Sequence, residues 1–310
     1  MNDMQRYIVE EWAEDYREGR LGRREFVRRI AMMSGGAALA APVLQTLGVA
    51  ATPEEIAEAA SSQASVVAQA TGVTVRPDDP AIQAELLTFP SGQTTVYGYL
   101  ARPRAGGPAP GVVVIHENRG MLEHFKDISR RLAKAGYVGL AVDLASPVGG
   151  TDAFSDLSQV STALGQTPPA QHVVLLNDGV RYLQTQSFVR RDRVGAMGFC
   201  FGGGITWRLA TQNPDLRAAV PFYGTNPPLE DVPKIRAAIL AIYGELDARV
   251  NAGIPAIRDA MRRANVVHDI VIYPRSNHAF FNDTFDRYNP DAARDAWQRT
   301  LAWFERYLKG

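Results

Sequence analysis

The sequence predicts an α/β protein with a mostly parallel central sheet, helices on both faces and a helical N-terminal segment. From residue 110 onward, short apolar runs rich in Val and Ile alternate with stretches of helical spacing, as in a parallel sheet with crossover helices. The run Gly111–Ile115 reads "GVVVI", without polar interruption, which is typical of a strand buried on both faces. With 46% hydrophobic and 21% charged residues in 310, the chain can build a large core.

The sequence of the N-terminal region predicts an amphipathic helix over residues 1–29, followed by an apolar segment. Residues 1–29 are charge-rich, with Ile8, Trp12 and Tyr16 at helical spacing. A twin arginine, Arg23-Arg24, then precedes a mildly apolar run rich in Gly and Ala that ends near residue 51. This pattern resembles a twin-arginine export signal, and its alternative is a surface helix followed by a buried one. The small residues and the internal Pro42 argue against a membrane span.

The chain therefore divides into three predicted parts. Residues 1–51 form the N-terminal helix and export signal, residues 52–79 are an Ala/Ser/Glu-rich linker, and residues 80–310 are the main domain. That domain opens on a hairpin, because apolar and polar residues alternate on both sides of Ser91-Gly92. Further strands are expected at 111–117, 137–143, 193–199, 218–223, 238–243 and 268–273, and helices at 123–135, 171–184, 203–211, 252–264 and 290–308.

Composition excludes several classes of function. The 33 basic and 33 acidic residues give a net charge of zero, so nucleic acid is not an expected partner. A single cysteine excludes an intramolecular disulfide and a cysteine-based metal cluster. The five histidines show no metal-ligand pair such as HxxxH, so we expect no metal site.

The only cysteine lies in the most glycine-rich stretch of the chain, "GFCFGGG" (198–204), between a predicted strand and a predicted helix. Gly198 and Gly202 flank Cys200 in the G-x-nucleophile-x-G form of a nucleophile elbow, where glycines permit a strained turn. At a helix N-terminus the macrodipole favours a thiolate. The alternative is an ordinary strand-to-helix turn that Cys200 merely fills.

Two further residues follow later strands. Asp247 comes just after the strand at 238–243, and His278 lies in the loop after the strand at 268–273. Taken singly, each could be a turn carboxylate or a surface histidine. The chain order of nucleophile, acid and histidine, each after its own strand, favours a catalytic triad. Carboxyl ends of parallel strands also meet at one edge of the sheet.

A fourth polar residue ends the buried run at 111–115. Glu117, in "VIHENRG", lies where the following loop normally contributes to an oxyanion hole. Beside a thiol, a carboxylate can accept the proton or hydrogen bond of the resting Cys200. The alternative is a solvated loop residue.

These motifs carry a family resemblance. Residues 80–310 resemble the dienelactone hydrolase family of α/β-hydrolases in "HENRG", "DL" (143–144), "GFCFGGG", "GELD" with Asp247 and "NHAF" with His278. The resemblance implies an α/β-hydrolase fold, a Cys-His-Asp triad and Glu117 as the partner of the thiol. It also implies an oxyanion hole made by the backbone N–H groups of Phe201 and Asn118, without metal or organic cofactor.

The sequence departs from the aromatic-degradation members of that family at two positions. Where they carry arginines that bind the substrate carboxylate, this chain has Pro147 and Asn282. The candidates for replacing those arginines, and for apolar contacts with substrate, are Arg119, Arg249, Arg275, Phe280 and Tyr223. For the aromatic residues, simple core packing is an equal alternative.

The expected activity is hydrolysis of an ester or lactone through an acyl-enzyme on Cys200. Thioesterase or peptidase action on the same triad is the alternative, as is a non-catalytic redox or binding protein on this scaffold. We expect a monomer that acts on a small-molecule substrate. We also expect export to the periplasm or beyond by the twin-arginine machinery, with the cytoplasm as the alternative location.

Overall fold

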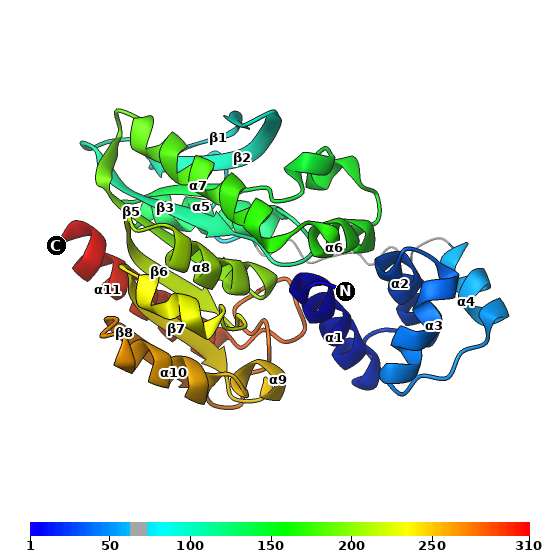
Figure 1. The fold of residues 1–310 in the computed structure, drawn as a ribbon. Helices are drawn as coiled ribbons and strands as arrows, with labels where there is room; N and C mark the ends of the chain where they lie inside the picture. Colours follow the sequence, from blue (N-terminus) through cyan, green and yellow to red (C-terminus); the bar gives the residue numbers. More distant parts are fainter. Residues whose placement is uncertain (63–72) are drawn as a thin grey trace.

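The computed structural model describes residues 1–62 and 73–310, and its centre is an eight-stranded sheet in the order β1-β2-β4-β3-β5-β6-β7-β8 (Figure 1). Strands β3 to β8 run parallel, while β1 and β2 pair antiparallel with each other and β2 pairs antiparallel with β4. The mostly parallel sheet predicted from the sequence is confirmed. The strands are β1 Ile82–Ser91, β2 Thr94–Pro103, β3 Ala109–Ile115, β4 Val138–Val142, β5 Val189–Phe199, β6 Leu216–Phe222, β7 Ala238–Gly244 and β8 His268–Tyr273.

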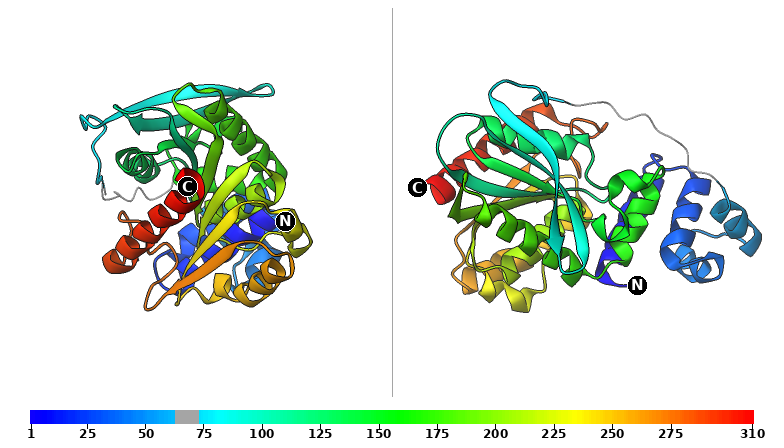
Figure 2. Two further views of the ribbon diagram at one scale, coloured as in Figure 1. Left: turned by 90° about the vertical axis from the view of Figure 1, so that its left-hand side faces the viewer. Right: turned by 90° about the horizontal axis from the view of Figure 1, so that it is seen from above.

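Helices cover both faces of this sheet, with α5 and α11 on one face and α7, α8 and α10 on the other (Figure 2). Two helices of the main domain were not predicted, the short α9 and α6 Leu157–Gln166, whose N-cap Asp156 accepts a hydrogen bond from the Ser158 N–H. The helices of the main domain are α5 Glu123–Lys134, α6, α7 Pro169–Thr185, α8 Phe201–Gln212, α9 Ala248–Asn251, α10 Ile254–Arg263 and α11 Pro290–Phe304.

Strand β3 lies inside the sheet, between β4 and β5. Its residues Val112–Ile115 are fully buried. Both neighbours supply backbone partners and both faces are covered by helices, so each position of the strand needs an apolar side chain. The hairpin is also confirmed, because Ser91 pairs with Thr94 across a turn in which Gly92 has φ of 58°. Glycine adopts that left-handed conformation at little cost.

The N-terminal region folds into four helices, α1 Asp3–Arg17, α2 Arg23–Ser34, α3 Ala37–Thr46 and α4 Pro53–Ala60. The single helix expected over 1–29 is divided after Arg17, where Gly19 takes φ of 75° and Gly22 caps α2. Within the segment interpreted as a linker, residues 53–60 form α4, which starts with a capping box between Thr52 and Glu55. Residues 63–72 of that segment lie outside the described residues.

These four helices are not separate from the main domain. Helix α1 packs against α6 and α8, and α2, α3 and α4 lie on its outer side (Figure 1). Ile8 of α1 and Met33 of α2 both pack against Gly165 in α6, where a side chain would collide with them. Among the described helices, none is both long and apolar enough to cross a membrane.

Candidate active site

Cys200 stands at the turn between β5 and α8 with φ of 58° and ψ of −119°. That backbone conformation is costly for a residue with a side chain, and it is retained mainly where the surroundings enforce it. The flanking glycines permit it here, because they allow close packing around the turn. A Cβ on Gly198 would lie under 3.0 Å from Thr206 Oγ1 and the Gly202 carbonyl, and one on Gly202 would meet the carbonyls of Ile115 and His116. The glycines therefore let the elbow pack against β3 while it presents the sulfur.

The predicted acid and base of the triad lie together. His278 Nδ1 is 2.5 Å from Asp247 Oδ2, and both side chains are buried. Asp247 follows β7 and is the N-cap of α9, where its Oδ1 accepts the Val250 N–H. His278 lies in the loop after β8, the neighbouring strand. Adjacent strands thus bring the pair together at their carboxyl ends.

Burial and charge act in opposite directions on this pair. Burial lowers the pKa of His278, but the charge and hydrogen bond of Asp247 more than compensate, so the pKa lies above its ordinary 6.5. Burial raises the pKa of Asp247, but the imidazole opposite brings it below 3.8. Asp247 is therefore an ionised carboxylate that orients His278 through Nδ1 and leaves Nε2 near Cys200.

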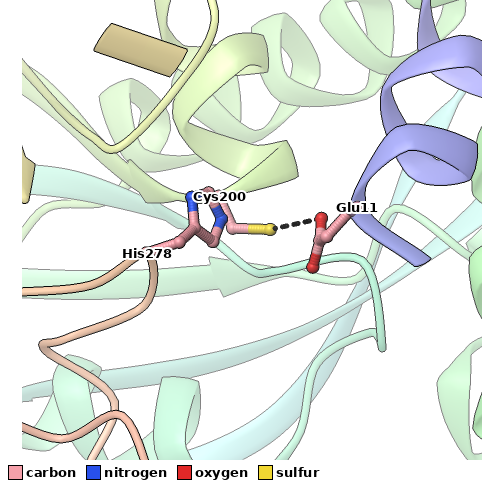
Figure 3. A group of neighbouring side chains, drawn as sticks. All are labelled: Glu11, Cys200 and His278. Carbon is pink, nitrogen blue, oxygen red and sulfur yellow. Dashed lines mark hydrogen bonds between the residues drawn. The ribbon is translucent and has the colours of Figure 1, made fainter. Parts of the chain in front are cut away.

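The sulfur of Cys200 forms hydrogen bonds with two side chains that the sequence did not suggest, both from α1. Sγ donates to Glu11 Oε2 at 3.3 Å, and the Tyr7 hydroxyl donates to Sγ at 3.3 Å. The Tyr7 oxygen is also 3.5 Å from His278 Nε2. Within the described chain no hydrogen bond joins Cys200 directly to His278, although the two lie close together (Figure 3).

These surroundings hold Cys200 as a thiol. Burial raises the pKa of Cys200 well above 9.0, and the negative charges of Glu11 and Glu117 raise it further. The side chain is only 2% exposed. The helix N-terminus that follows Cys200 does not produce an ionised resting thiol here, because desolvation and two carboxylates oppose it.

Glu117 occupies the expected place after β3, but it is not the hydrogen-bond partner of the thiol in this structure. Its Oε2 accepts the Asn282 amide at 3.0 Å, and its Oε1 is buried without a hydrogen-bond partner. Glu11 takes the thiol proton's hydrogen bond instead. Burial raises the pKa of Glu117. Asn282, at one of the family's arginine positions, thus serves to hold this carboxylate.

The two residues expected to supply oxyanion donors lie close in the chain to Cys200 and Glu117. Phe201 begins α8 directly after Cys200, and its backbone N–H lowers the pKa of the thiol. Asn118 follows Glu117 and is buried, with its carbonyl fixed by the Ser161 hydroxyl at 2.8 Å. Ser161 belongs to α6, so this unpredicted helix supports the loop that carries Asn118.

A cavity of about 1100 Å³ reaches Cys200 between the N-terminal helices and the main domain. Its wall includes Glu11, Glu117, Asn118 and Cys200 as well as several arginines. Of the three arginines suggested as substrate contacts, only Arg119 lines it, with its guanidinium 4.9 Å from the centre of the Phe285 ring.

The other suggested contacts do not line this cavity. Arg249 lies under α1, 4.8 Å from the Tyr7 ring centre and 3.5 Å from Glu14. Arg275 is exposed on a turn where its N–H donates to Glu245. Phe280 and Tyr223 are fully buried and pack against each other, with Tyr223 beside the His278 ring. Core packing, the alternative for these aromatic residues, describes both.

One trio could offer metal ligands in the described residues, namely Glu11, Cys200 and His278, whose ligand atoms lie within 4.8 Å of one another. The Tyr7 hydroxyl is within 3.5 Å of both Sγ and Nε2, so a metal ion between them would have to displace it. The buried thiol is also protonated, whereas a metal requires thiolate. The arrangement fits a closed hydrolase site better than a metal centre.

Sequence reasoning missed Tyr7 and Glu11 because their pattern carries no chemical signature. They lie four residues apart on one face of α1, as any pair on an amphipathic helix does. The stripe recognised from the sequence, with Ile8 and Trp12, is indeed buried. Nothing in the spacing reveals that the neighbouring face of α1 meets Cys200.

Comparisons with known proteins agree with this geometry. The model of the dienelactone hydrolase family matches residues 96–308. A provisionally named carboxymethylenebutenolidase of Escherichia coli strain K12 is 35% identical over 263 residues, which cover 81% of this chain and 94% of the relative. A similar relative from Methylorubrum extorquens is 33% identical over 246 residues, or 76% and 84% of the two chains.

A solved structure gives the same result in three dimensions. The crystal structure of a provisionally named dienelactone hydrolase from Klebsiella pneumoniae superimposes with a TM-score of 0.68 at 34% identity. The alignment includes all of that protein but only 73% of this chain, so a sizeable part of this chain has no counterpart in it. The chain therefore belongs to the dienelactone hydrolase family of the α/β-hydrolase superfamily, and is by that membership an enzyme that hydrolyses lactones or esters.

Proposed function

We propose that the protein hydrolyses a carboxylic ester or lactone through an acyl-enzyme on Cys200. The observation that supports this best is the joint geometry of the elbow and the His278–Asp247 pair, which follow three strands at one edge of the sheet. A cysteine that merely filled a turn would not need an oriented imidazole 3.5 Å from a hydroxyl that itself contacts the sulfur.

The reaction begins when His278 Nε2 takes the thiol proton and Sγ attacks the substrate carbonyl carbon. The carbonyl oxygen becomes an oxyanion, which the N–H groups of Phe201 and Asn118 stabilise, with one well-placed donor worth about 3–4 kcal/mol. The C–O bond then breaks, and protonated His278 returns its proton to the leaving oxygen. In a lactone that alcohol stays attached to the acyl group.

Deacylation repeats these steps with water as the nucleophile. His278 removes a proton from water, hydroxide adds to the thioester carbonyl, and the sulfur leaves and regains the proton. Asp247 stabilises the imidazolium in both halves of the reaction without taking a proton itself. Arg119, on the cavity wall beside Asn118, is the positive side chain proposed to contact substrate.

Export by the twin-arginine route is part of the proposal. Arg23 and Arg24 lie on the exposed side of α2, where they pair with Glu55 and Glu58 of α4 at 3.5 and 3.1 Å. Phe26, two residues further on, is completely buried. The arginines are thus accessible to a receptor even when the N-terminal helices are docked.

The test uses a p-nitrophenyl ester, a panel of small lactones and intact-mass analysis. We expect a covalent acyl adduct on the wild-type protein, and Cys200→Ala should show no adduct and lower kcat/KM by at least about 10³-fold, since triad members act as a unit. Circular dichroism serves as the control for folding. An adduct that persists in Cys200→Ala would place the nucleophile elsewhere. If the folded wild-type protein hydrolyses none of these substrates, a redox or binding role is favoured.

A further inference from the structure

Helix α1 lies across the catalytic groups and contributes two side chains to them. Tyr7 and Glu11 point from one face of the helix towards Cys200, and Figure 3 shows the Glu11 carboxylate facing the sulfur. Both residues precede residue 96, where the match to the family begins. They belong to this chain's own N-terminal helices and not to the shared catalytic domain.

The Tyr7 hydroxyl occupies the position that a substrate needs. A carbonyl carbon under attack must come within about 3–3.5 Å of Sγ, and its leaving oxygen must come within hydrogen-bond reach of Nε2. The Tyr7 oxygen is 3.3 Å from the first atom and 3.5 Å from the second. An acyl group and this hydroxyl cannot occupy the same space.

Glu11 opposes activation of the nucleophile by a different route. The thiol hydrogen points to Glu11 Oε2, so it is directed away from His278, the base that has to receive it. The negative charge of Glu11 also disfavours the thiolate. Together the two side chains block the acyl position and hold the proton on sulfur.

Both apolar and polar contacts hold α1 in place. Ile8 and Trp12 are buried in the core, and polar contacts lie towards the two ends of the helix. Asp3 pairs with Arg208 of α8 at 3.2 Å, the Asn2 amide donates to the Gly165 carbonyl at 3.0 Å, and Asp15 at the other end pairs with Arg287. Asp3 is exposed, so its ion pair is screened and contributes little to stability, whereas Asp15 and Arg287 are largely buried and their pair is less screened. The cavity that leads to Cys200 runs along Glu11, so an entering molecule meets the edge of α1 before it meets the sulfur.

We propose that α1 is a movable cover of the active site, and that the structure shows the resting state in which Tyr7 and Glu11 fill the acyl position. Turnover requires α1 to withdraw, and the competent state is the open fraction of the population. This inference rests on the proposed function for its meaning, because the covered groups are those of the hydrolase. The cover itself can be measured without turnover.

The first experiment measures alkylation of Cys200, the sole cysteine, by iodoacetamide in the full chain. Tyr7→Ala should raise the second-order rate of alkylation on the order of tenfold. Removal of the ring gives the reagent room beside Sγ, and a larger fraction of the molecules is open. Arg6→Ala, on the exposed side of the same helix, should leave the rate unchanged. Equal rates in Tyr7→Ala and wild type would overturn the proposal.

The second experiment separates a cover from a proton relay, since Tyr7 also links Sγ to Nε2. A cover predicts that Tyr7→Phe and Tyr7→Ala keep or raise kcat/KM for a small p-nitrophenyl ester. A relay predicts that both lower it, and that outcome would contradict a covering role. If wild type and both variants hydrolyse nothing while alkylation still responds to Tyr7→Ala, the cover stands and the hydrolase proposal fails.

Asp15→Asn loosens α1 without altering a group that touches the sulfur. It weakens the pair with Arg287 at the far end of the helix and should raise the alkylation rate in the same direction as Tyr7→Ala, by a smaller factor. No change in this variant, with Tyr7→Ala still faster, would mean that Tyr7 acts as a local obstacle and that α1 does not move. Thermal unfolding of each variant verifies that the fold is retained.

Discussion

At the scale of single residues, the site depends on positions that carry no side chain. Gly202 lies against the carbonyls of Ile115 and His116, so the helix after Cys200 approaches the end of β3 backbone to backbone. Phe201 begins that helix, and Asn118 lies in the loop after β3. In the proposed mechanism this close contact holds the two oxyanion donors in position.

Gly202→Ala tests this directly. We expect the free energy of unfolding to fall by about 1–3 kcal/mol, because the added methyl collides with backbone that cannot move aside. Activity should fall with it as the elbow shifts. Gly22→Ala is the matched control, since a Cβ there meets nothing within 4 Å. Urea denaturation measures both, and equal stability of the two variants would mean that the contact at Gly202 relaxes freely.

At the scale of elements, the N-terminal helices are joined to the main domain by a buried arginine. Arg28 of α2 is 3% exposed and bonds Asp156 at 2.9 Å and the Ser158 hydroxyl at 2.7 Å, both at the start of α6. It also pairs with Glu25 of its own helix. Because α6 in turn fixes the Asn118 carbonyl through Ser161, this junction connects α2 to the oxyanion loop.

Replacing Arg28 by Ala should therefore loosen the N-terminal helices selectively. Removal leaves the largely buried Asp156 carboxylate without its cation, whereas Glu25 keeps its pair with Arg29. Charged hydrogen bonds are worth about 1.5–3 kcal/mol each. Amide hydrogen exchange should accelerate in α1 and α2 while β3 and β5 stay protected. Arg24→Ala, which removes an exposed ion pair with Glu58, should change exchange very little. Uniform acceleration across the sheet would instead indicate global destabilisation.

At the scale of the whole molecule, the chain combines a family hydrolase domain with four N-terminal helices, the first of which contacts Cys200. The same helices carry the twin arginine. If both the export proposal and the cover proposal hold, the same N-terminal region directs export and covers the Cys200 thiol before substrate arrives. Both roles are compatible in one docked structure, because Arg23 and Arg24 face solvent while Tyr7 and Glu11 face the site.

The double substitution Arg23→Lys with Arg24→Lys separates these roles. It keeps both positive charges near Glu55 and Glu58, so docking, thermal stability and ester hydrolysis should be unchanged. Export should be lost, because a receptor that reads paired guanidinium groups does not accept ammonium groups equally. Fractionation of expressing cells measures the location. Equal export of both proteins, or retention of the unmutated protein in the cytosol, would contradict the signal interpretation.

The sequence by itself determined the sheet, the hairpin and the identity of the family. Each depends on local pattern: continuous apolar runs for buried strands, a glycine at a positive φ for the turn, and glycines around Cys200 where side chains would collide. Asp247 and His278 could also be found from the sequence, because strand ends in a parallel sheet meet at one edge and chain order distinguishes the two residues.

Only the tertiary structure decided which side chains contact the sulfur. Glu117 is in the expected place, yet Glu11 accepts the thiol's hydrogen bond, and Arg249 lies under α1 instead of lining the cavity. Glu11 and Cys200 are 189 residues apart in the chain, and the periodicity of α1 specifies an apolar stripe without specifying its partner. Docking of a helix depends on the complementary surface of the folded domain, which exists only after the sheet, α6 and α8 have assembled.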